Sequence, residues 1–346
     1  MAIENFNPNN AASNDAGIFG LPHEADEAKI IIIPIEWEVT VSYGSGASEG
    51  PFAVYDASFQ LDLCHHDYPE LWKEGVYMDD FPEDLRTLSK MLKSDAQIII
   101  ENIENGVDTL NDPVLKKLYC NIQDGCETLN SWVFERVAYW KSQGKIVGLL
   151  GGDHSTPYGY IKYLSTQYSS FGVLTVDAHM DLRNGFEGFL YSHASIFYNV
   201  LQLPEVSKMV QVGIRDYCHE EKDFVAAQGD RLKIFYDRDM QRAQYFGKNW
   251  NEIVQEIIGN LPENVYVTVD IDGLNPHLCP NTGTPVPGGL EFEQLAFLLH
   301  EIGKSGKKLI GFDLCEVSPG DNEWDGNVGA RVLYQLCGMA STNLNQ

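Results

Sequence analysis

The chain has 346 residues, with 24 lysines and arginines against 50 aspartates and glutamates, so its formal net charge is −26. This acidic balance argues against nucleic acid and anionic membrane surfaces as partners, because both are negatively charged themselves. No aliphatic run is long enough to span a bilayer, and the seven scattered cysteines form no C-x-x-C pair, so we expect a cytoplasmic protein with reduced thiols.

Residues 1–28 are expected to form an N-terminal arm or a loosely held lead-in, because they show no apolar periodicity. The run Ile30 to Ile33 predicts a buried strand, and the Gly/Ser-rich segment 42–50 predicts a loop of the kind that often touches ligands. A short helix is predicted at 85–92 and a further strand at 98–100.

Helices and strands alternate from residue 121 onward. Apolar spacing predicts strands at 145–150, 171–176, 209–214, 232–236, 265–269 and 309–312, and helices at 121–143, 155–168, 250–258 and 291–302. This alternation predicts an α/β fold with three layers, α/β/α, around a mostly parallel central sheet. With no internal repeat and no break in composition, residues 29–346 are expected to form a single catalytic domain.

Polar clusters follow four of the predicted strands. They are Gly151 to Ser155, Asp177 to Asp181, Asp270 to Asp272 and Asp313 to Glu316. Since residues two apart in extended backbone face the same way, Asp177, His179 and Asp181 can converge, as can Asp270 and Asp272. In a parallel sheet the carboxyl ends of the strands meet at one edge, where ligands bind.

Such a gathering of carboxylates predicts divalent cations, since without them the charges would repel one another and raise one another's pKa. A single aspartate at a strand end is more often a cap or a turn residue, but three carboxylate clusters together with histidines exceed what capping explains. The predominance of carboxylate oxygen favours Mn²⁺ over a structural zinc, with Ni²⁺, Mg²⁺ and iron as alternatives.

The motifs GGDHS, DAHMD, DIDGLNP and DLCE, at Gly151, Asp177, Asp270 and Asp313 respectively, resemble those of the ureohydrolases, the family of arginase and agmatinase. Their order and approximate spacing match over about residues 28–337. The resemblance implies an arginase-like fold and two metal ions. One ion would be bound by His154, Asp177, Asp181 and Asp270, and the other by His179, Asp177, Asp270 and Asp272.

The activity that the resemblance implies is hydrolysis of the guanidino C–N bond of a small cationic substrate, which gives urea and an amine. Glu316 would hydrogen-bond the guanidinium, and His193 would serve as the proton shuttle for the leaving amine. The expected catalytic residues are therefore His193, Glu316 and the metal ligand Asp181. The family also implies a homo-oligomer, a trimer or a hexamer.

Two departures from the family pattern bear on the substrate. Asn275 stands where most relatives carry aspartate, and Arg183 stands near a position where relatives acting on arginine carry asparagine. Arg183 is similar to the arginine of formimidoylglutamases, whereas His193 and the loop 42–50 are closer to agmatinases. We therefore rank an agmatinase-like hydrolase first, ahead of formimidoylglutamase, arginase and other guanidine or guanidino-acid hydrolases.

Two further classes of protein fit the sequence less well. A metal-dependent amide deacetylase shares the layered architecture but typically uses one zinc ion, with a tyrosine and paired histidines at the site. Two histidine-containing motifs together with both bridging aspartates favour two metal ions instead. A metal-stabilised scaffold would be expected to have lost a ligand or Glu316, and all are present. The segment His65-His66-Asp67 is given no role.

Overall fold

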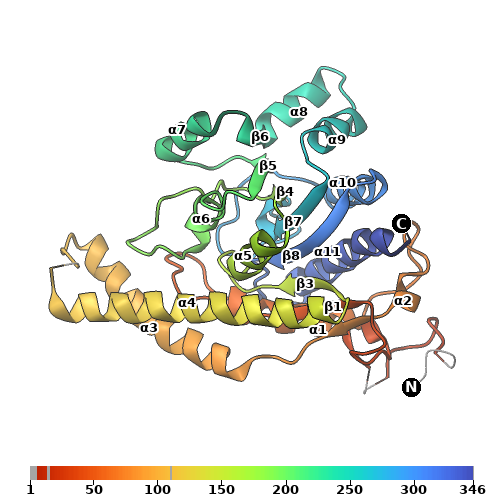
Figure 1. Ribbon diagram of the computed structural model, residues 1–346, viewed down its shortest axis with the longest axis horizontal. Helices are drawn as coiled ribbons and strands as arrows, with labels where there is room; N and C mark the ends of the chain where they lie inside the picture. Colours follow the sequence, from red (N-terminus) through yellow and green to blue (C-terminus); the bar gives the residue numbers. More distant parts are fainter. Residues whose placement is uncertain (1–5, 14–15, 110, 346) are drawn as a thin grey trace.

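In a computed structural model, described for residues 6–13, 16–109 and 111–345, eight parallel strands form one sheet with helices on both faces (Figure 1). The strand order is β2-β1-β3-β8-β7-β4-β5-β6, and each neighbouring pair is parallel. The strands are β1 (Ile30–Pro34), β2 (Val76–Met78), β3 (Ile146–Leu150), β4 (Phe171–Val176), β5 (Val206–Ile214), β6 (Leu232–Tyr236), β7 (Asn264–Asp270) and β8 (Lys308–Cys315).

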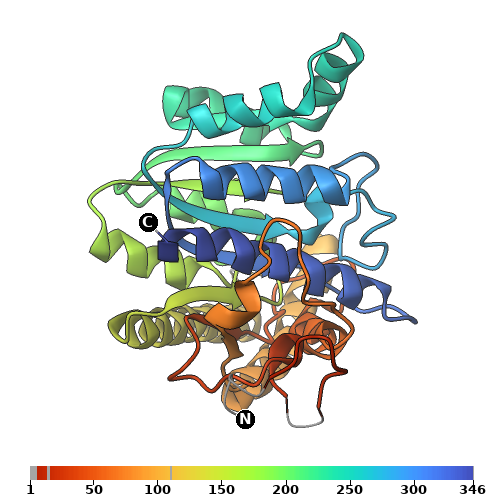
Figure 2. The same ribbon diagram turned by 90° about the vertical axis from the view of Figure 1, so that its right-hand side faces the viewer.

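Helices cover the two faces of the sheet in separate groups (Figures 1 and 2). One face packs against α3 (Glu83–Glu104), α4 (Pro113–Ser142), α5 (Tyr158–Gln167) and α6 (Ile196–Val200). The other packs against α1 (Gly50–Ser58), α9 (Trp250–Gly259), α10 (Phe292–Lys304) and α11 (Trp324–Ser341). The remaining helices are α2 (Leu71–Glu74), α7 (His219–Gln228) and α8 (Asp237–Tyr245).

The uninterrupted apolar character of β1 follows from this layering. Ile30 and Ile32 lie in the core beneath α1, α10 and α11, whereas Ile31 and Ile33 lie in the core beneath α3 and α4. All four side chains are fully buried, because successive residues of a strand point to opposite faces and both faces are covered. The predicted three-layer α/β/α architecture with a parallel sheet is therefore confirmed.

The predicted strand at 98–100 is wrong, because these residues belong to the long helix α3. The buried residues of α3 follow helical spacing, with Leu92, Ala96, Ile99 and Ile100 on one side. Read alone, the isoleucines resemble a strand. Together with Leu92 and Ala96 they form the apolar stripe that packs against α4.

The N-terminal segment is held more firmly than expected from residue 16 onward. Ile18, Phe19 and Leu21 are almost fully buried in the core beside α1. The backbone N–H of Phe19 donates a hydrogen bond of 2.9 Å to the hydroxyl of Ser58 at the end of α1. This part of residues 1–28 therefore packs as part of the globular structure.

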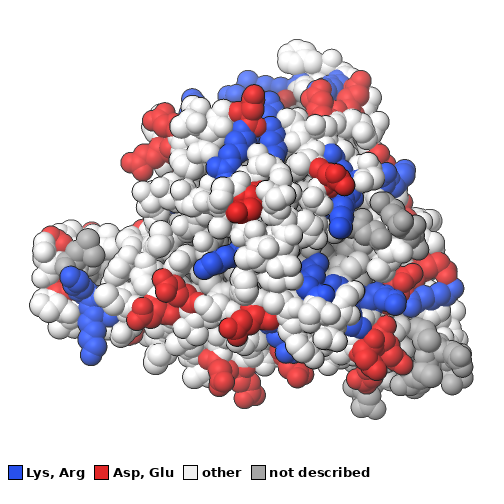
Figure 3. Space-filling view, viewed as in Figure 1, with Lys and Arg blue, Asp and Glu red and all other residues white. Residues whose placement is uncertain are grey.

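None of the helices in the described parts of the chain combines the length and apolarity that crossing a membrane would require. On the face shown in Figure 3, acidic and basic side chains are interspersed over the helices. The acidic excess is therefore not gathered into one continuous patch on that face.

Candidate active site

The six predicted metal ligands meet at the carboxyl edge of the sheet. His154 follows β3, Asp177, His179 and Asp181 follow β4, and Asp270 and Asp272 lie at the end of β7. His179 is half-buried and the other five are buried. The parallel sheet thus brings together side chains that lie up to 118 residues apart.

Glycines permit the close packing of the loops that carry these ligands. A Cβ atom on Gly152 would lie 1.9 Å from the carbonyl oxygen of Trp37, and one on Gly273 would lie 2.7 Å from the backbone nitrogen of Asp177. No larger side chain fits at either place without moving the backbone. This explains glycine beside the ligands in GGDHS and DIDG.

The first cluster of ligand atoms surrounds His154. Its Nδ1 atom lies 3.2 or 3.3 Å from one carboxylate oxygen of each of three aspartates, Asp177, Asp181 and Asp270. Among the described residues, neither His154 Nδ1 nor Asp177 Oδ2 has a hydrogen-bond partner, although both are buried. Buried polar atoms are rarely left without a partner, and a cation coordinated by these atoms would satisfy all of them.

The other ring nitrogen of His154 fixes the tautomer. His154 Nε2 lies 2.8 Å from the hydroxyl oxygen of Thr268, and that hydroxyl donates a 2.7 Å hydrogen bond to Asp313 Oδ1. Because the hydroxyl proton is directed at Asp313, Nε2 must be the donor to Thr268. The lone pair of His154 is then on Nδ1, directed at the three carboxylates, as a metal ligand requires.

The second cluster centres on His179. Its Nδ1 atom lies 3.0 Å from Asp272 Oδ2 and 3.7 Å from Asp177 Oδ1. Asp177 thus directs one oxygen to each cluster, and in each triplet, His154/Asp177/Asp181 and Asp177/His179/Asp272, the ligand atoms lie within 4.8 Å of one another. The residues fit two neighbouring cations bridged by Asp177.

A third triplet, His154, Asp313 and Cys315, is also close enough to hold a metal ion. There, however, Asp313 Oδ1 already accepts hydrogen bonds from Thr268 and from the Cys315 thiol. Burial and the neighbouring Asp313 raise the pKa of Cys315 well above its usual value, so the thiol stays protonated. This triplet is the hydrogen-bonded support behind His154.

Electrostatics point to cations in the same place. Burial and the Asp177 carboxylate raise the pKa of Asp181 to about 7, and burial with Asp272 and Asp177 raises the pKa of Asp270 well above its usual value. Although burial opposes it, the carboxylates of Asp272 and Asp177 raise the pKa of His179 to about 12. Divalent ions would replace the protons that this site otherwise retains.

Asp181 and Glu316 both have left-handed backbone, with φ of 53° and 62°. This conformation costs a non-glycine residue on the order of 1–3 kcal/mol and persists where the surrounding structure imposes it. Glu316 follows β8, and its Oε1 accepts a 2.8 Å hydrogen bond from the backbone N–H of His154. Its carboxylate is thereby fixed beside the first cluster.

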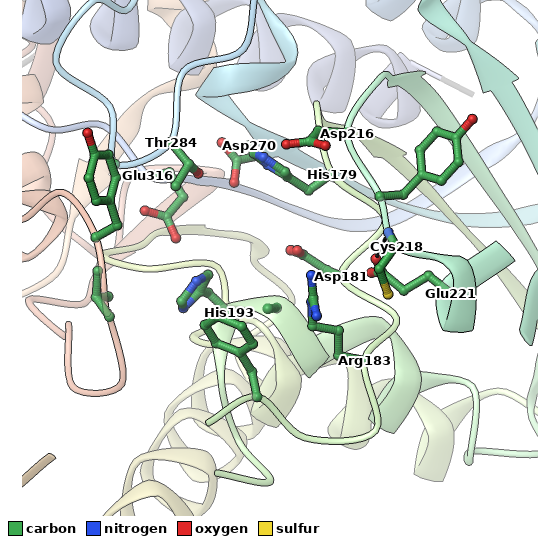
Figure 4. Close-up of a pocket in the computed structure, with 16 residues that line it drawn as sticks. His179, Asp181, Arg183, His193, Asp216, Cys218, Glu221, Asp270, Thr284 and Glu316 are labelled. Atoms are coloured by element: carbon green, nitrogen blue, oxygen red, sulfur yellow. Dashed lines mark hydrogen bonds between the residues drawn. The ribbon is translucent and has the colours of Figure 1, made fainter. Parts of the chain in front are cut away.

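His193 lies across the cavity from the metal-ligand residues (Figure 4). It begins a short 3-10 helix, and its Nδ1 atom lies 3.3 Å from the hydroxyl oxygen of Ser192. Burial and the nearby imidazoles of His179 and His154 lower its pKa to about 4. The imidazole is therefore neutral near pH 7 and able to accept a proton.

These side chains face a cavity of about 260 Å³ (Figure 4). His179, Asp181, His193, Asp270 and Glu316 line it. The other predicted ligands, His154, Asp177 and Asp272, do not line the cavity itself, though they contact residues that do. His65 does not line it either, and stacks on Tyr68 near α11.

The model of the arginase family matches residues 28–338. The chain belongs to the arginase family. It is 27% identical to an N(1)-aminopropylagmatine ureohydrolase of Thermus thermophilus over 91% of both chains, and 32% identical to a proclavaminate amidinohydrolase of Streptomyces clavuligerus over 94% of both. The crystal structure of an agmatine ureohydrolase of Thermoplasma volcanium has the same fold, with a TM-score of 0.70, 22% identity and 94% of both chains covered.

Several residues that line the cavity of this arginase-family chain were not singled out from the sequence. They are Val41, Tyr43, Phe186, Asp216, Tyr217, Cys218, Glu221, Gly283 and Thr284. Val41 and Tyr43 lie at or beside the Gly/Ser-rich loop that was expected to touch ligands, and Asp216 to Cys218 directly follow β5. Their position after a predicted strand was the one feature of the sequence that could have identified Asp216 to Cys218 as cavity residues, because no motif contains them.

Proposed function

We propose that this arginase-family chain is a metal-dependent hydrolase that cleaves the guanidino C–N bond of a small molecule to urea and an amine, as an agmatinase does. The observation that carries the proposal is the pair of adjoining ligand clusters that share Asp177, beside a cavity that also contains Glu316. The relatives named agmatinase and aminopropylagmatine ureohydrolase support the same reaction.

The residues proposed to hold the ions are those expected from the motifs. His154, Asp177, Asp181 and Asp270 would hold one ion, and His179, Asp177, Asp270 and Asp272 the other. When bound, two divalent ions supply Lewis-acid activation of a water molecule near neutral pH. Manganese is proposed because carboxylate oxygens outnumber the two imidazoles and no thiolate takes part.

Glu316 is proposed to orient the substrate. Its fixed carboxylate can accept two hydrogen bonds from a guanidinium and balance that positive charge. Hydrolysis adds the oxygen of water to the guanidino carbon and breaks the bond to the alkyl nitrogen. The leaving nitrogen must gain a proton, and the neutral His193 is proposed to relay it.

The decisive experiment is urea release by the manganese-loaded protein from agmatine, arginine, 4-guanidinobutyrate and guanidine, with Asp270→Ala as control. Urea from at least one compound, lost in Asp270→Ala together with bound metal, would support the proposal. Full turnover and two tightly bound ions in Asp270→Ala would refute the assignment of Asp270 as a bridging ligand.

A second candidate is formimidoylglutamase, which Arg183 in the cavity wall favours. Formamide or ammonia from formiminoglutamate, with no urea from any guanidino compound, would establish it. Amide deacetylation is less favoured, since two adjoining ligand clusters exceed what one zinc ion requires.

We also propose a cytoplasmic homo-oligomer, a trimer or hexamer, in which residues 29–346 form one catalytic domain and residues 1–28 form an N-terminal arm that packs against this domain from residue 16 onward. The family resemblance supports the assembly, and the reduced, scattered cysteines are compatible with the cytoplasm. Light scattering on the purified protein would measure the number of subunits.

A further inference from the structure

The segment 41–48 forms part of the cavity wall, yet few backbone contacts hold it. Val41 and Tyr43 line the active-site cavity, and Tyr43 is 75% exposed. Among the described residues, the backbone groups of residues 40–45 form no hydrogen bond with other backbone groups. Side-chain contacts therefore hold this segment over the cavity.

The carboxylate of Glu38 provides most of these contacts. Glu38 is almost fully buried. The backbone N–H of Gly46 donates to both of its carboxylate oxygens, at 3.2 and 3.1 Å. The backbone N–H and the hydroxyl of Ser48 donate to Oε2 at 3.2 and 3.1 Å. One side chain thus ties the end of the segment to the chain that follows β1.

Helix α3 in turn holds Glu38 through Ser89 and Lys93, which lie one turn apart on the same face of the helix. The Ser89 hydroxyl accepts a 3.0 Å hydrogen bond from the backbone N–H of Glu38. Lys93 Nζ donates to Glu38 Oε1 at 2.8 Å and to the Ser45 hydroxyl at 2.6 Å. Although burial raises it, the pKa of Glu38 is lowered overall by Lys93 and the loop donors. The ion pair therefore joins α3 both to Glu38 and to the segment itself.

The segment also packs against the part of the cavity wall beside Glu316. A Cβ atom on Gly44 would lie 2.2 Å from the carbonyl oxygen of Gly283, so the two backbones are in close contact. A Cβ atom on Gly283 would in turn lie 3.8 Å from Glu316 Oε2. A shift of the segment would therefore open the cavity wall next to the Glu316 carboxylate.

We infer that Glu38 and Lys93 are positioning residues of the active site, whose ion pair holds the segment 41–48 against the cavity. Neither side chain lines the cavity, so both act through the segment. The inference rests on the proposed hydrolysis for its effect on turnover. The position of the segment, however, can be measured without any substrate.

The first test is amide hydrogen exchange in Lys93→Met, which removes the ammonium. The amides of residues 41–48 should exchange about 10-fold to 100-fold faster than in the wild type, as expected when a charged hydrogen bond is lost. The amides of α4 should change by less than about twofold. Lys93→Arg keeps the charge and should restore much of the protection. Lys90→Met, an exposed position on the same helix, is the matched control and should exchange like the wild type.

Two milder variants cover the case in which Lys93→Met fails to fold. Ser45→Ala and Ser48→Ala each remove a contact of the segment without leaving the buried carboxylate of Glu38 unpaired. Exchange of residues 41–48 should be about 3-fold to 10-fold faster in each. Wild-type exchange of the segment in every folded variant would overturn the inference.

The second test is turnover by the manganese-loaded protein of whichever guanidino compound the wild type hydrolyses. Lys93→Met should raise KM about 10-fold and leave kcat within about threefold, because the segment forms the wall of the cavity and contributes no metal ligand. A smaller folded fraction would instead lower kcat at unchanged KM. That result, or faster exchange with unchanged KM, would overturn the inference.

Failure of the proposed reaction would be recognised separately. If the wild type with two bound ions hydrolysed none of the guanidino compounds, the proposed function would fail. Hydrogen exchange would still show whether Lys93 and Glu38 hold the segment over the cavity, and so would decide the inference.

Discussion

The hydroxyl of Thr268 orients the imidazole of His154, because it accepts a hydrogen bond from Nε2. Thr268→Val keeps the shape of the side chain but removes the acceptor for His154 Nε2 and the donor to Asp313. We expect the affinity of the site near His154 for Mn²⁺ to fall about 10-fold to 100-fold, as loss of such supporting contacts does. Calorimetric titration of the metal-free protein measures this change.

Thr268→Ser is the matched control, since it restores the hydroxyl. It should bind both ions with nearly wild-type affinity. Unchanged affinity in Thr268→Val would mean that packing alone orients His154, and that the hydrogen bonds through Thr268 and Asp313 have no effect on the metal site.

His193→Ala is expected to lower kcat about 100-fold with both ions still bound, because a positioned general acid or base contributes about 10²-fold to 10⁴-fold. His193 lines the cavity and contacts none of the predicted ligands through a hydrogen bond or ion pair among the described residues. Added imidazole should restore part of the rate. Wild-type turnover in His193→Ala would identify His193 as a wall residue without a role in proton transfer.

The sequence singled out the candidate site residues more readily than the residues that support them. The six ligands, Glu316 and His193 stood out because several carboxylates and imidazoles followed predicted strands or matched family motifs. Thr268 did not, since a threonine inside a strand is ordinary. The left-handed backbone of Asp181 and Glu316 could not be anticipated either, because it is imposed by tertiary contacts.

At the scale of elements, one polar cluster joins the edge strand β2 to helix α4. Asp79, directly after β2, accepts two hydrogen bonds from the Arg136 guanidinium and a third, of 2.7 Å, from Trp140 Nε1. Asp79 is buried, so Arg136→Met would remove the positive charge beside it and leave its carboxylate with two uncharged donors, Trp140 Nε1 and the backbone N–H of Asp80. We expect the free energy of unfolding to fall by about 2–3 kcal/mol, measured by urea denaturation.

Arg238→Met provides the comparison, because the Arg238–Asp239 pair is largely exposed. Its loss should cost less than about 0.5 kcal/mol, as for most exposed pairs. Equal effects of the two substitutions would show that the Asp79 cluster does not tie β2 to α4 more strongly than a surface pair would.

The sequence predicted those helices and strands whose local apolar pattern matches the burial that the fold imposes on them. Strands β4 and β6 have the predicted bounds. Helix α11 was missed because nearly all of its residues are buried, so its sequence shows no polar face. Strand β2 was missed because three residues carry too little pattern to recognise.

For the whole molecule, we expect stabilisation by manganese to grow with pH. In the metal-free protein the pKa of Asp181 is raised to about 7 by burial and Asp177, against about 3.9 in an unfolded chain. The folded state therefore binds the extra proton between these values, so its stability falls as pH rises through about 4 to 7. The pKa of His179 is raised to about 12 by the carboxylates of Asp272 and Asp177. Stability therefore continues to fall as the pH rises above the pKa of an unfolded histidine.

Bound ions replace these protons, so the metal-loaded protein should not lose stability as the pH rises. A manganese concentration of about 100 times the dissociation constant at pH 8 should raise the melting temperature by about 5 °C at that pH. The same concentration should raise it by less at pH 5, where protons compete with the ions. Thermal scans with manganese or with a chelator measure both shifts. A shift that was equal or smaller at pH 8 would contradict the raised pKa values.

The order of strands also has a consequence for when the protein can first hold its ions. Strand β8, which follows the other seven described strands in the sequence, lies between β3 and β7, and so separates the strand that His154 follows from the strand that carries Asp270. Until β8 is inserted, these two predicted ligands have no common sheet to align them. We therefore expect metal ions to bind only after β8 has been synthesised, and a chain that ends before β8 to lack the complete site.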